Sequence, residues 1–210
     1  MRFFKATLTT NSYLYFYSTE FLKTTTVSRI LHNWALMFAL NNIRSDENKR
    51  HLENLQNINF YCTPAIPKKS DKQSFLLNPI PEDTGAGKLG IMRIEKFVPG
   101  SEFEFIVMSK DGREPPDIIS YGKKRSHHRV MYEELNLKSE YKDKVYLRTK
   151  QFINPLDFKQ IENIRYAKKL PMKPSPLYIV EAEFYDVYVL PQINTQQIFP
   201  ANFPYLEWSK

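Results

Sequence analysis

The segment PLYIVEAEFYDVYVL, residues 176–190, is a β-strand pattern, and it decides the fold class. Tyr178, Val180, Ala182 and Phe184 alternate with more polar neighbours, as they do in a strand with one buried face. The chain also opens with a β-prone segment at residues 3–17, interrupted at Asn11 and Ser12. Similar β-prone segments lie between these two, namely INFYCTPAIP (58–67), KLGIMRIEKF (88–97), SEFEFIVMS (101–109), PDIISYGKK (116–124) and KVYLRTKQFI (144–153).

Three segments predict helices. Thr24–Thr26 offer capping hydroxyls, and apolar residues then recur at helical spacing until Asn41 and Asn42, at Val27, Ile30, Leu31, Trp34 and Phe38. A second helix can follow Pro155, over residues 154–170, and a weaker one is expected at 52–55. This order of elements predicts one α+β domain over residues 1–210. We expect a ferredoxin-like or RRM-like RAMP fold with a mostly antiparallel sheet and one long N-terminal helix.

The segment between the strand that Pro64 ends and the next strand has the composition of a loop. Residues 67–90 are rich in Pro, Lys, Ser and Asn and hold three of the six glycines, so we predict a surface insertion at 63–90. GAGKLG (85–90) matches a dinucleotide-binding pattern, but it lacks the strand before it and the helix after it. We therefore expect a flexible loop here, whose Lys88 and the nearby Arg93 can contact phosphate.

Composition and charge indicate what kind of protein this is and which partners it favours. The hydrophobic fraction of 42% and the aromatic fraction of 14% are typical of a folded chain. The net charge of +7 favours polyanionic partners, with nucleic acid first. The single cysteine, Cys62, excludes an internal disulfide and fits a reducing compartment. Neither a signal peptide nor an apolar run of membrane-spanning length is evident, so we expect a cytoplasmic protein with no membrane partner. No residue pair has recognised metal spacing, and we expect no metal or cofactor.

The segment YGKKRSHHRV, residues 121–130, is the strongest candidate site, because it holds four strong cations and two histidines without an acid. If it is extended, one side presents Tyr121, Lys123, Arg125, His127 and Arg129. The other side presents Gly122, Lys124, Ser126, His128 and Val130 and is also largely polar, so we expect a projecting hairpin or arm. An aromatic residue among cations suits single-stranded RNA, whose bases stack and whose phosphates pair with Lys and Arg.

The same segment raises the question of cleavage. Tyr, Lys and His side chains can supply the base, the acid and the cation that metal-independent RNA cleavage needs. Alternation, however, sends His127 and His128 to opposite faces, which favours binding over cutting. A solvated basic hairpin remains the plain structural alternative. Arg29 and His32, in the first predicted helix, join the RNA-binding candidates, although a histidine beside an apolar stripe is more often a packed, hydrogen-bonded residue.

Several dispersed motifs occur in the order and spacing of one family. They are MRFFKATLTT (1–10), LHNWALMFAL (31–40), YCTPAIP (61–67), FEFIVMS (103–109) and IISYGKKRSHHRV (118–130), followed by INPLDF (153–158). With this order the chain resembles the type I-D CRISPR effector subunit of the Cas-five superfamily, known as Csc-one. The resemblance extends from residue 1 to about residue 190 and rests on the shared order of the motifs.

The resemblance implies a non-catalytic RNA-binding subunit that caps the 5′ handle of the guide RNA in a CRISPR surveillance complex. It implies contacts with the backbone Cas-seven-type subunit and the large Cas-ten-type subunit, and a part in inspecting the flanking motif of target DNA. Relatives from another CRISPR subtype use a protein of this superfamily as the guide-processing endonuclease, so a metal-independent endoribonuclease that cuts repeat RNA is the alternative. In type I-D systems that task resembles the role of a separate ribonuclease, so the resemblance favours binding over cutting. One departure from the family pattern is that no glycine-rich loop lies near the C-terminus, since Gly122 is the last glycine.

Overall fold

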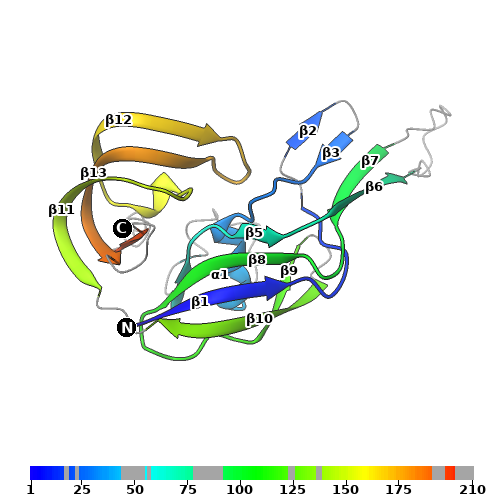
Figure 1. Cartoon of the computed structure of the whole chain (residues 1–210), viewed down its shortest axis with the longest axis horizontal. Helices are drawn as coiled ribbons and strands as arrows, with labels where there is room; N and C mark the ends of the chain where they lie inside the picture. Colours follow the sequence, from blue (N-terminus) through cyan, green and yellow to red (C-terminus); the bar gives the residue numbers. More distant parts are fainter. Residues whose placement is uncertain are drawn as a thin grey trace.

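The computed structural model describes residues 1–16, 19–21, 24–43, 55, 58–77, 92–122, 126–135, 139–190 and 197–201. Its central sheet has the strand order β4-β8-β1-β10-β9, with β5 also paired to β8, and all of these pairs are antiparallel (Figure 1). The strands are β1 (Arg2–Thr9), β4 (Phe60–Cys62), β5 (Ile66–Lys69), β8 (Glu102–Ser109), β9 (Ile118–Tyr121) and β10 (Ser126–Leu135). The prediction of a mostly antiparallel sheet is confirmed.

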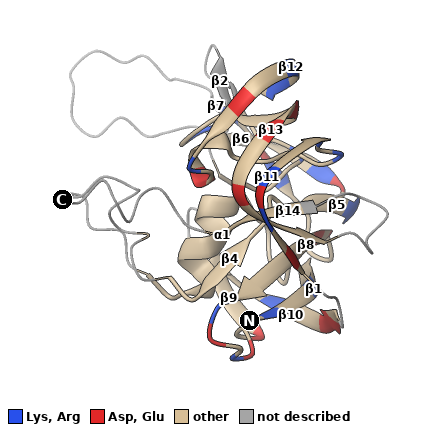
Figure 2. Cartoon of the chain, turned by 90° about the vertical axis from the view of Figure 1, so that its left-hand side faces the viewer, with Lys and Arg blue, Asp and Glu red and all other residues tan. Residues whose placement is uncertain are grey.

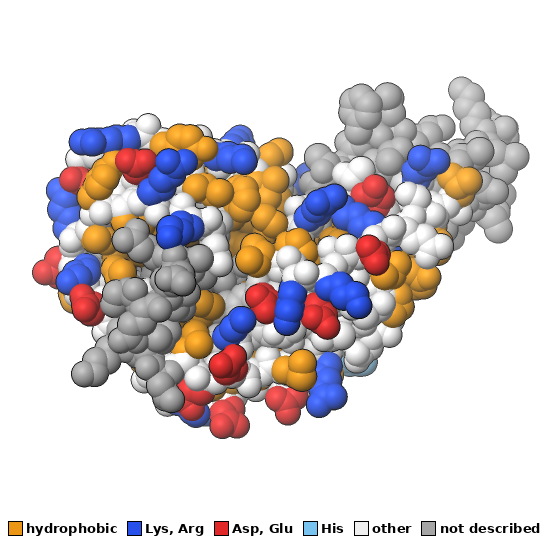
Figure 3. All heavy atoms as spheres, in the orientation of Figure 1, with side chains coloured by type: hydrophobic (Ala, Val, Ile, Leu, Met, Phe, Trp, Pro, Cys, Tyr) orange, Lys and Arg blue, Asp and Glu red, His pale blue; other side chains and the backbone are white. Residues whose placement is uncertain are grey.

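The two faces of the central sheet differ in polarity. Ala6, Leu8 and Phe103 belong to the main core and are completely buried. On the opposite face Lys5 lies across from Glu133 and forms an ion pair of 3.4 Å with Glu104. Basic and acidic side chains are interspersed on this face in Figure 3, so its charges largely compensate one another.

The main helix, α1 (Asn33–Leu40), is shorter than predicted and begins later. The expected caps at Thr24–Thr26 instead form strand β3, which pairs with β7. Leu31 is extended and bridges to Ala65, and His32 is the N-cap. The expectation of a long N-terminal helix is therefore wrong. Leu31 has helical spacing with Trp34, but strand pairing buries it without a helix.

A second sheet lies beside the first, with the order β11-β13-β12 and with β14 also paired to β13 (Figure 1). Its elements are β11 (Glu140–Arg148), β12 (Ile161–Leu170), β13 (Leu177–Leu190) and β14 (Gln197–Pro200), with the 3-10 turn η1 (Pro155–Asp157) before β12. Phe199 of β14 packs edge-on against Phe3 of β1 at 5.2 Å, so the two sheets share the main core.

The predicted helix over residues 154–170 is wrong. Asn154 caps a turn that begins at Pro155, where the helix was expected, but the turn ends after Asp157. Phe158 then packs against Phe184 in the core of the second sheet, at 5.5 Å between ring centroids. Residues 161–170 form the edge strand β12 along β13. Pairing with the long strand β13 therefore overrides the helix-forming composition of this segment.

A third, smaller sheet has the order β2-β3-β7-β6. It comprises β2 (Thr19–Phe21), β3 (Thr24–Thr26), β6 (Lys72–Leu77) and β7 (Met92–Phe97), and the β6–β7 ribbon extends away from the central sheet in Figure 1. The loop predicted at 67–90 is thus partly strand, because residues 66–69 pair with β8 and residues 72–77 pair with β7. Lys88 and GAGKLG lie outside the described residues, as does the helix predicted at 52–55 apart from Leu55.

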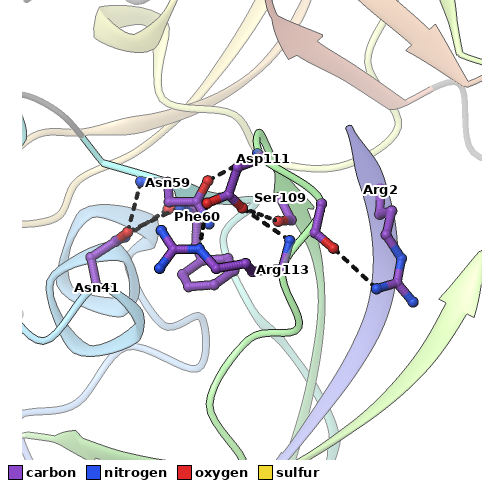
Figure 4. Close-up of polar contacts among 8 residues, drawn as sticks. Arg2, Asn41, Asn59, Phe60, Ser109, Asp111 and Arg113 are labelled. Atoms are coloured by element: carbon purple, nitrogen blue, oxygen red, sulfur yellow. Dashed lines mark hydrogen bonds and ion pairs between the residues drawn. The ribbon is translucent and has the colours of Figure 1, made fainter.

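A polar network fixes the C-terminal end of α1 (Figure 4). The Asn41 amide donates to the carbonyls of Met37 and Phe60, both at 2.8 Å, and its oxygen accepts from the backbone of Asn59 and Phe60. The Asn59 side-chain oxygen in turn accepts from the Asp111 backbone at 3.0 Å. These bonds hold α1 against β4 and the turn after β8. Within the described residues, no helix is long and apolar enough to span a membrane.

Candidate functional site

A groove of about 1200 Å³ runs between α1 and the edge strand β9. None of the described residues that line it is Asp or Glu, and Lys173 is the one Lys or Arg among them. The lining is mainly aromatic, apolar or small, and comprises Phe16, His32, Trp34, Ala35, Phe38, Ala39, Asn42, Ile43, Pro116, Ile118, Ser120, Tyr121, Gly122, His127, Lys173 and Pro174. Such a lining suits a flat ligand with apolar faces, and its charge does not repel an anion.

Helix α1 supplies one wall of the groove. Leu36 and Met37 are completely buried on the core side of the helix. The side facing the groove has an exposed Ala35 and half-buried Phe38 and Ala39. The helix has no charged residue, as Figure 2 shows, so the wall it presents to the groove is apolar.

The buried carboxylate of Asp157, in η1, fixes the beginning of α1. It accepts hydrogen bonds from Asn33 Nδ2 and Trp34 Nε1, both at 2.6 Å, and from the Tyr61 hydroxyl at 2.9 Å. Burial raises the pKa of Asp157 to about 7, although the three donors act in the opposite direction. Sequence reasoning missed this residue. The only signal was its place in INPLDF, because nothing local shows that it meets the helix.

His32, the N-cap of α1, lines the groove and is only 2% exposed. Its Nδ1 accepts from the Trp34 backbone at 3.1 Å, so in the neutral ring the hydrogen is on Nε2. Nε2 then lies 3.0 Å from the Ser175 carbonyl and 3.1 Å from the Ser175 hydroxyl. Both ring nitrogens are therefore occupied, and His32 joins α1 to the loop between β12 and β13. This is the packed role that the sequence also indicated.

The described part of the segment at 121–130 belongs to two paired strands, because Tyr121 ends β9 and Ser126 begins β10. Tyr121 is 4% exposed and His128 is completely buried, whereas His127 and Arg129 are exposed. The prediction that the two histidines lie on opposite faces is confirmed. The prediction that Tyr121 shares an exposed face with the cations is wrong, because the chain turns at Gly122 and the alternation does not continue through the turn.

The hydrogen bonds of the two histidines also keep them apart. His127 Nδ1 lies 3.0 Å from the Ser120 hydroxyl, at the groove. His128 Nε2 lies 3.3 Å from the Tyr121 carbonyl, inside the core. Burial lowers the pKa of His128, which favours its neutral form. The two rings therefore do not flank a common position where one phosphate could bind.

The structure brings four of the predicted residues together at the groove, namely His32, Tyr121, Gly122 and His127. Arg29 and Arg93 are exposed but do not line it. Lys123, Lys124 and Arg125 lie outside the described residues, between Gly122 at the groove and Ser126 at the start of β10. In the described part of the chain, no group of three or more His, Cys, Asp or Glu residues is placed to hold a metal ion.

A comparison with protein families finds the family that the order of motifs in the sequence indicated. The family model described as type I-D CRISPR-associated protein Cas5/Csc1 matches residues 1–207. No curated protein matches the chain. Among solved structures, the chain is similar to one from the cryo-EM structure of the type III-B Cmr-β complex bound to cognate target RNA and AMPPnP. The identity is 9%, the alignment covers 86% of each chain, and the TM-score is 0.47.

Proposed function

Because the chain belongs to the type I-D CRISPR-associated Cas5/Csc1 family, we propose that it is a non-catalytic RNA-binding subunit of the type I-D surveillance complex. In this proposal it caps the 5′ handle of the guide RNA. It also contacts the backbone Cas-seven-type subunit and the large Cas-ten-type subunit, close to the flanking motif of target DNA.

The groove, whose described lining holds no acid and includes Tyr121, Gly122 and His127, is the observation that supports RNA binding most strongly. Nucleobases have flat apolar faces, which fit a lining with Phe16, Trp34 and Phe38. The phosphates of a strand in the groove would meet Lys173, and none of the described lining residues is a carboxylate that would repel them. The outer face of the central sheet differs, because its lysines already have acidic partners.

The positions of the residues that cleavage would need favour RNA binding over RNA cleavage. A general acid and a general base must both reach the same phosphate. His128 and Tyr121 are buried, and burial raises the pKa of the Tyr121 hydroxyl. His127 is thus the one histidine of the pair at the groove, where Ser120 is its hydrogen-bond partner.

The salt dependence of RNA binding tests the assignment of the segment at 121–130. Four cations are changed together to Gln, namely Lys123, Lys124, Arg125 and Arg129. Each lost phosphate contact should lower the slope of log K against log salt by about 0.7. A matched variant removes four cations that have carboxylate partners, namely Lys142, Lys144, Arg148 and Lys159. We expect this control to keep most of the slope, and equal slopes in the two variants would overturn the assignment.

Two further experiments test the other parts of the proposal. Repeat RNA incubated with the chain in EDTA should stay intact, and cleavage that is lost on changing His127 to Ala would establish the endoribonuclease instead. Co-purification of the assembled complex, followed by crosslinking, should place the chain against the 5′ end of the guide RNA and against the backbone and large subunits. Crosslinks to protein alone would favour an assembly protein that does not bind RNA.

A further inference from the structure

A second surface, on the third sheet, combines aromatic rings with a lysine. It consists of Tyr13, Tyr15, Phe75 and Lys96, and we call it the aromatic–lysine cluster. The Lys96 ammonium lies 4.6 Å from the ring centroid of Phe75 and 5.2 Å from that of Tyr15. Tyr13 packs edge-on against Phe75 at 5.0 Å. The Tyr13 hydroxyl donates to Gln73 Oε1 at 2.9 Å, which holds a ring that is 40% exposed.

The lysine of this cluster has no carboxylate partner among the described residues, since its recorded contacts are with rings. The adjacent Glu95 points to the other face of the ribbon, where it accepts from the Val27 backbone and pairs with Lys72. On the second sheet the situation differs, because Lys144 also lies over a tyrosine ring but forms an ion pair of 2.9 Å with Glu183. The charge of Lys96 therefore remains available to an anion.

The cluster and the groove are joined by one short segment of the chain. Gly122 lines the groove, and a Cβ atom on it would lie 3.2 Å from the Tyr15 carbonyl oxygen and 2.6 Å from Leu14 Cδ1. The absence of a side chain thus lets the turn of the hairpin lie directly on the backbone of residues 14–15. Phe16, the next residue, lines the groove. One short segment of chain therefore connects the groove wall to the aromatic–lysine cluster.

The spacing of the rings suits a single strand. Leu14 pairs with Phe97 through two backbone hydrogen bonds, of 2.8 and 3.1 Å, so the chain is extended there. Tyr13 and Tyr15 consequently lie on the same side, about 7 Å apart along the strand. That separation is about two steps of stacked bases. Rings held in place beside an uncompensated cation form the kind of platform that binds single strands without reading their sequence.

We propose that the RNA strand held in the groove continues over the Gly122 turn, and that its next bases stack on the aromatic–lysine cluster while Lys96 contacts a phosphate. This inference rests on the proposed function, since it extends the same strand. The ligand class is single-stranded RNA, and the strand contacts two surfaces, the groove and the cluster.

A length series of RNA separates the two surfaces. Fluorescein-labelled oligouridylates from about 4 to about 16 nucleotides are bound to the full chain and followed by fluorescence anisotropy. The affinity of the wild-type chain should rise about tenfold once the strand is long enough to reach the cluster. In Tyr13→Leu this gain should disappear, while the affinity for the shortest RNA that binds stays unchanged. Lys96→Gln should lower the salt slope by about 0.7 for long RNA only.

Two control variants distinguish stacking from general damage. Tyr13→Phe keeps the ring and should keep the gain with length. Tyr141→Leu removes a tyrosine that is 48% exposed on the second sheet, outside the proposed path, and should also keep it. Thermal unfolding of each variant checks that the chain remains folded.

The outcomes tell the two proposals apart. If short RNA binds but the gain with length is missing in the wild type, or is kept in Tyr13→Leu, the cluster is not a stacking platform and the groove assignment stands. A gain seen with oligodeoxythymidylates but not with oligouridylates overturns RNA as the ligand of the cluster. If no RNA of any length binds, the proposed function fails and this inference fails with it.

Discussion

Changing Asp157 to Asn should remove a loss of stability that the wild-type chain suffers as pH rises. Burial raises the pKa of Asp157 from 3.8 to about 7. Between these two pH values the folded state keeps a proton that the unfolded state has released. The stability that Asp157 contributes is therefore fully present below about pH 4 and is lost as the pH rises to about 7. From pH 5 upward the loss amounts to about 3 kcal/mol, at 1.36 kcal/mol for each pKa unit.

Asparagine is a suitable replacement because it is neutral and can still be hydrogen-bonded at this position. Its oxygen can accept from Trp34 Nε1, as the carboxylate does. Its amide takes the place of Oδ2, which accepts from Asn33 Nδ2 in the wild type. It can donate to Asn33 Oδ1 once the Asn33 amide turns over, and that oxygen is buried and has no recorded partner in the described structure. The variant should therefore fold, and its stability should lack the dependence on pH that comes from Asp157.

Urea unfolding between about pH 5 and about pH 8 measures this effect. Fluorescence is a direct probe, since Trp34 donates to the carboxylate. The quantity to compare is the difference in unfolding free energy between wild type and variant, because other titrating groups cancel in it. Asp71→Asn, at an exposed position, is the matched control and should give a flat difference. If the Asp157→Asn difference is also flat within about 0.5 kcal/mol, the carboxylate is ionised throughout, and the three donors outweigh burial.

Three further predictions concern stability and reactivity. Gly122→Ala should destabilise the fold by about 1–3 kcal/mol more than Gly100→Ala. Both glycines have positive φ, but only a Cβ atom at position 122 would collide with Leu14. Equal losses of unfolding free energy in urea would contradict the close approach of Gly122 to Leu14. Burial raises the pKa of the Cys62 thiol well above its usual value. This thiol should therefore react with Ellman's reagent only as denaturant opens the core, and rapid reaction in buffer would refute its burial. Phe103→Ala should cost about 3–5 kcal/mol by calorimetry or urea unfolding, and a loss below about 1 kcal/mol would show that the core around it is loosely packed.

Much of the sheet structure was predictable from local patterns. Alternation along 101–109 and 176–190 marked β8 and β13, and it separated His127 from His128 correctly. The strand that Pro64 ends is β4. These predictions succeeded because side-chain direction in a strand depends only on position along it.

The candidate site was only partly predictable. The segment at 121–130 does reach the groove, through Tyr121, Gly122 and His127. The prediction that Tyr121 belongs to an exposed cationic face was wrong. Alternation predicts which residues share a face of a strand, but it does not predict which face the rest of the chain covers. Asp157 had no local signal, since its three donors come from residues at least 96 positions away.

The sequence by itself determined a β-rich, basic chain, the order of its main strands and the family to which it belongs. Tertiary structure alone decided that residues 161–170 form a strand along β13, that α1 begins at Asn33 rather than near Val27, and that the Gly122 turn lies on the backbone of Tyr15. The physical reason is common to all three. Local propensities differ by a few tenths of a kcal/mol per residue, whereas pairing with a distant strand or burial against a distant surface contributes more, and the partner cannot be recognised from the segment itself.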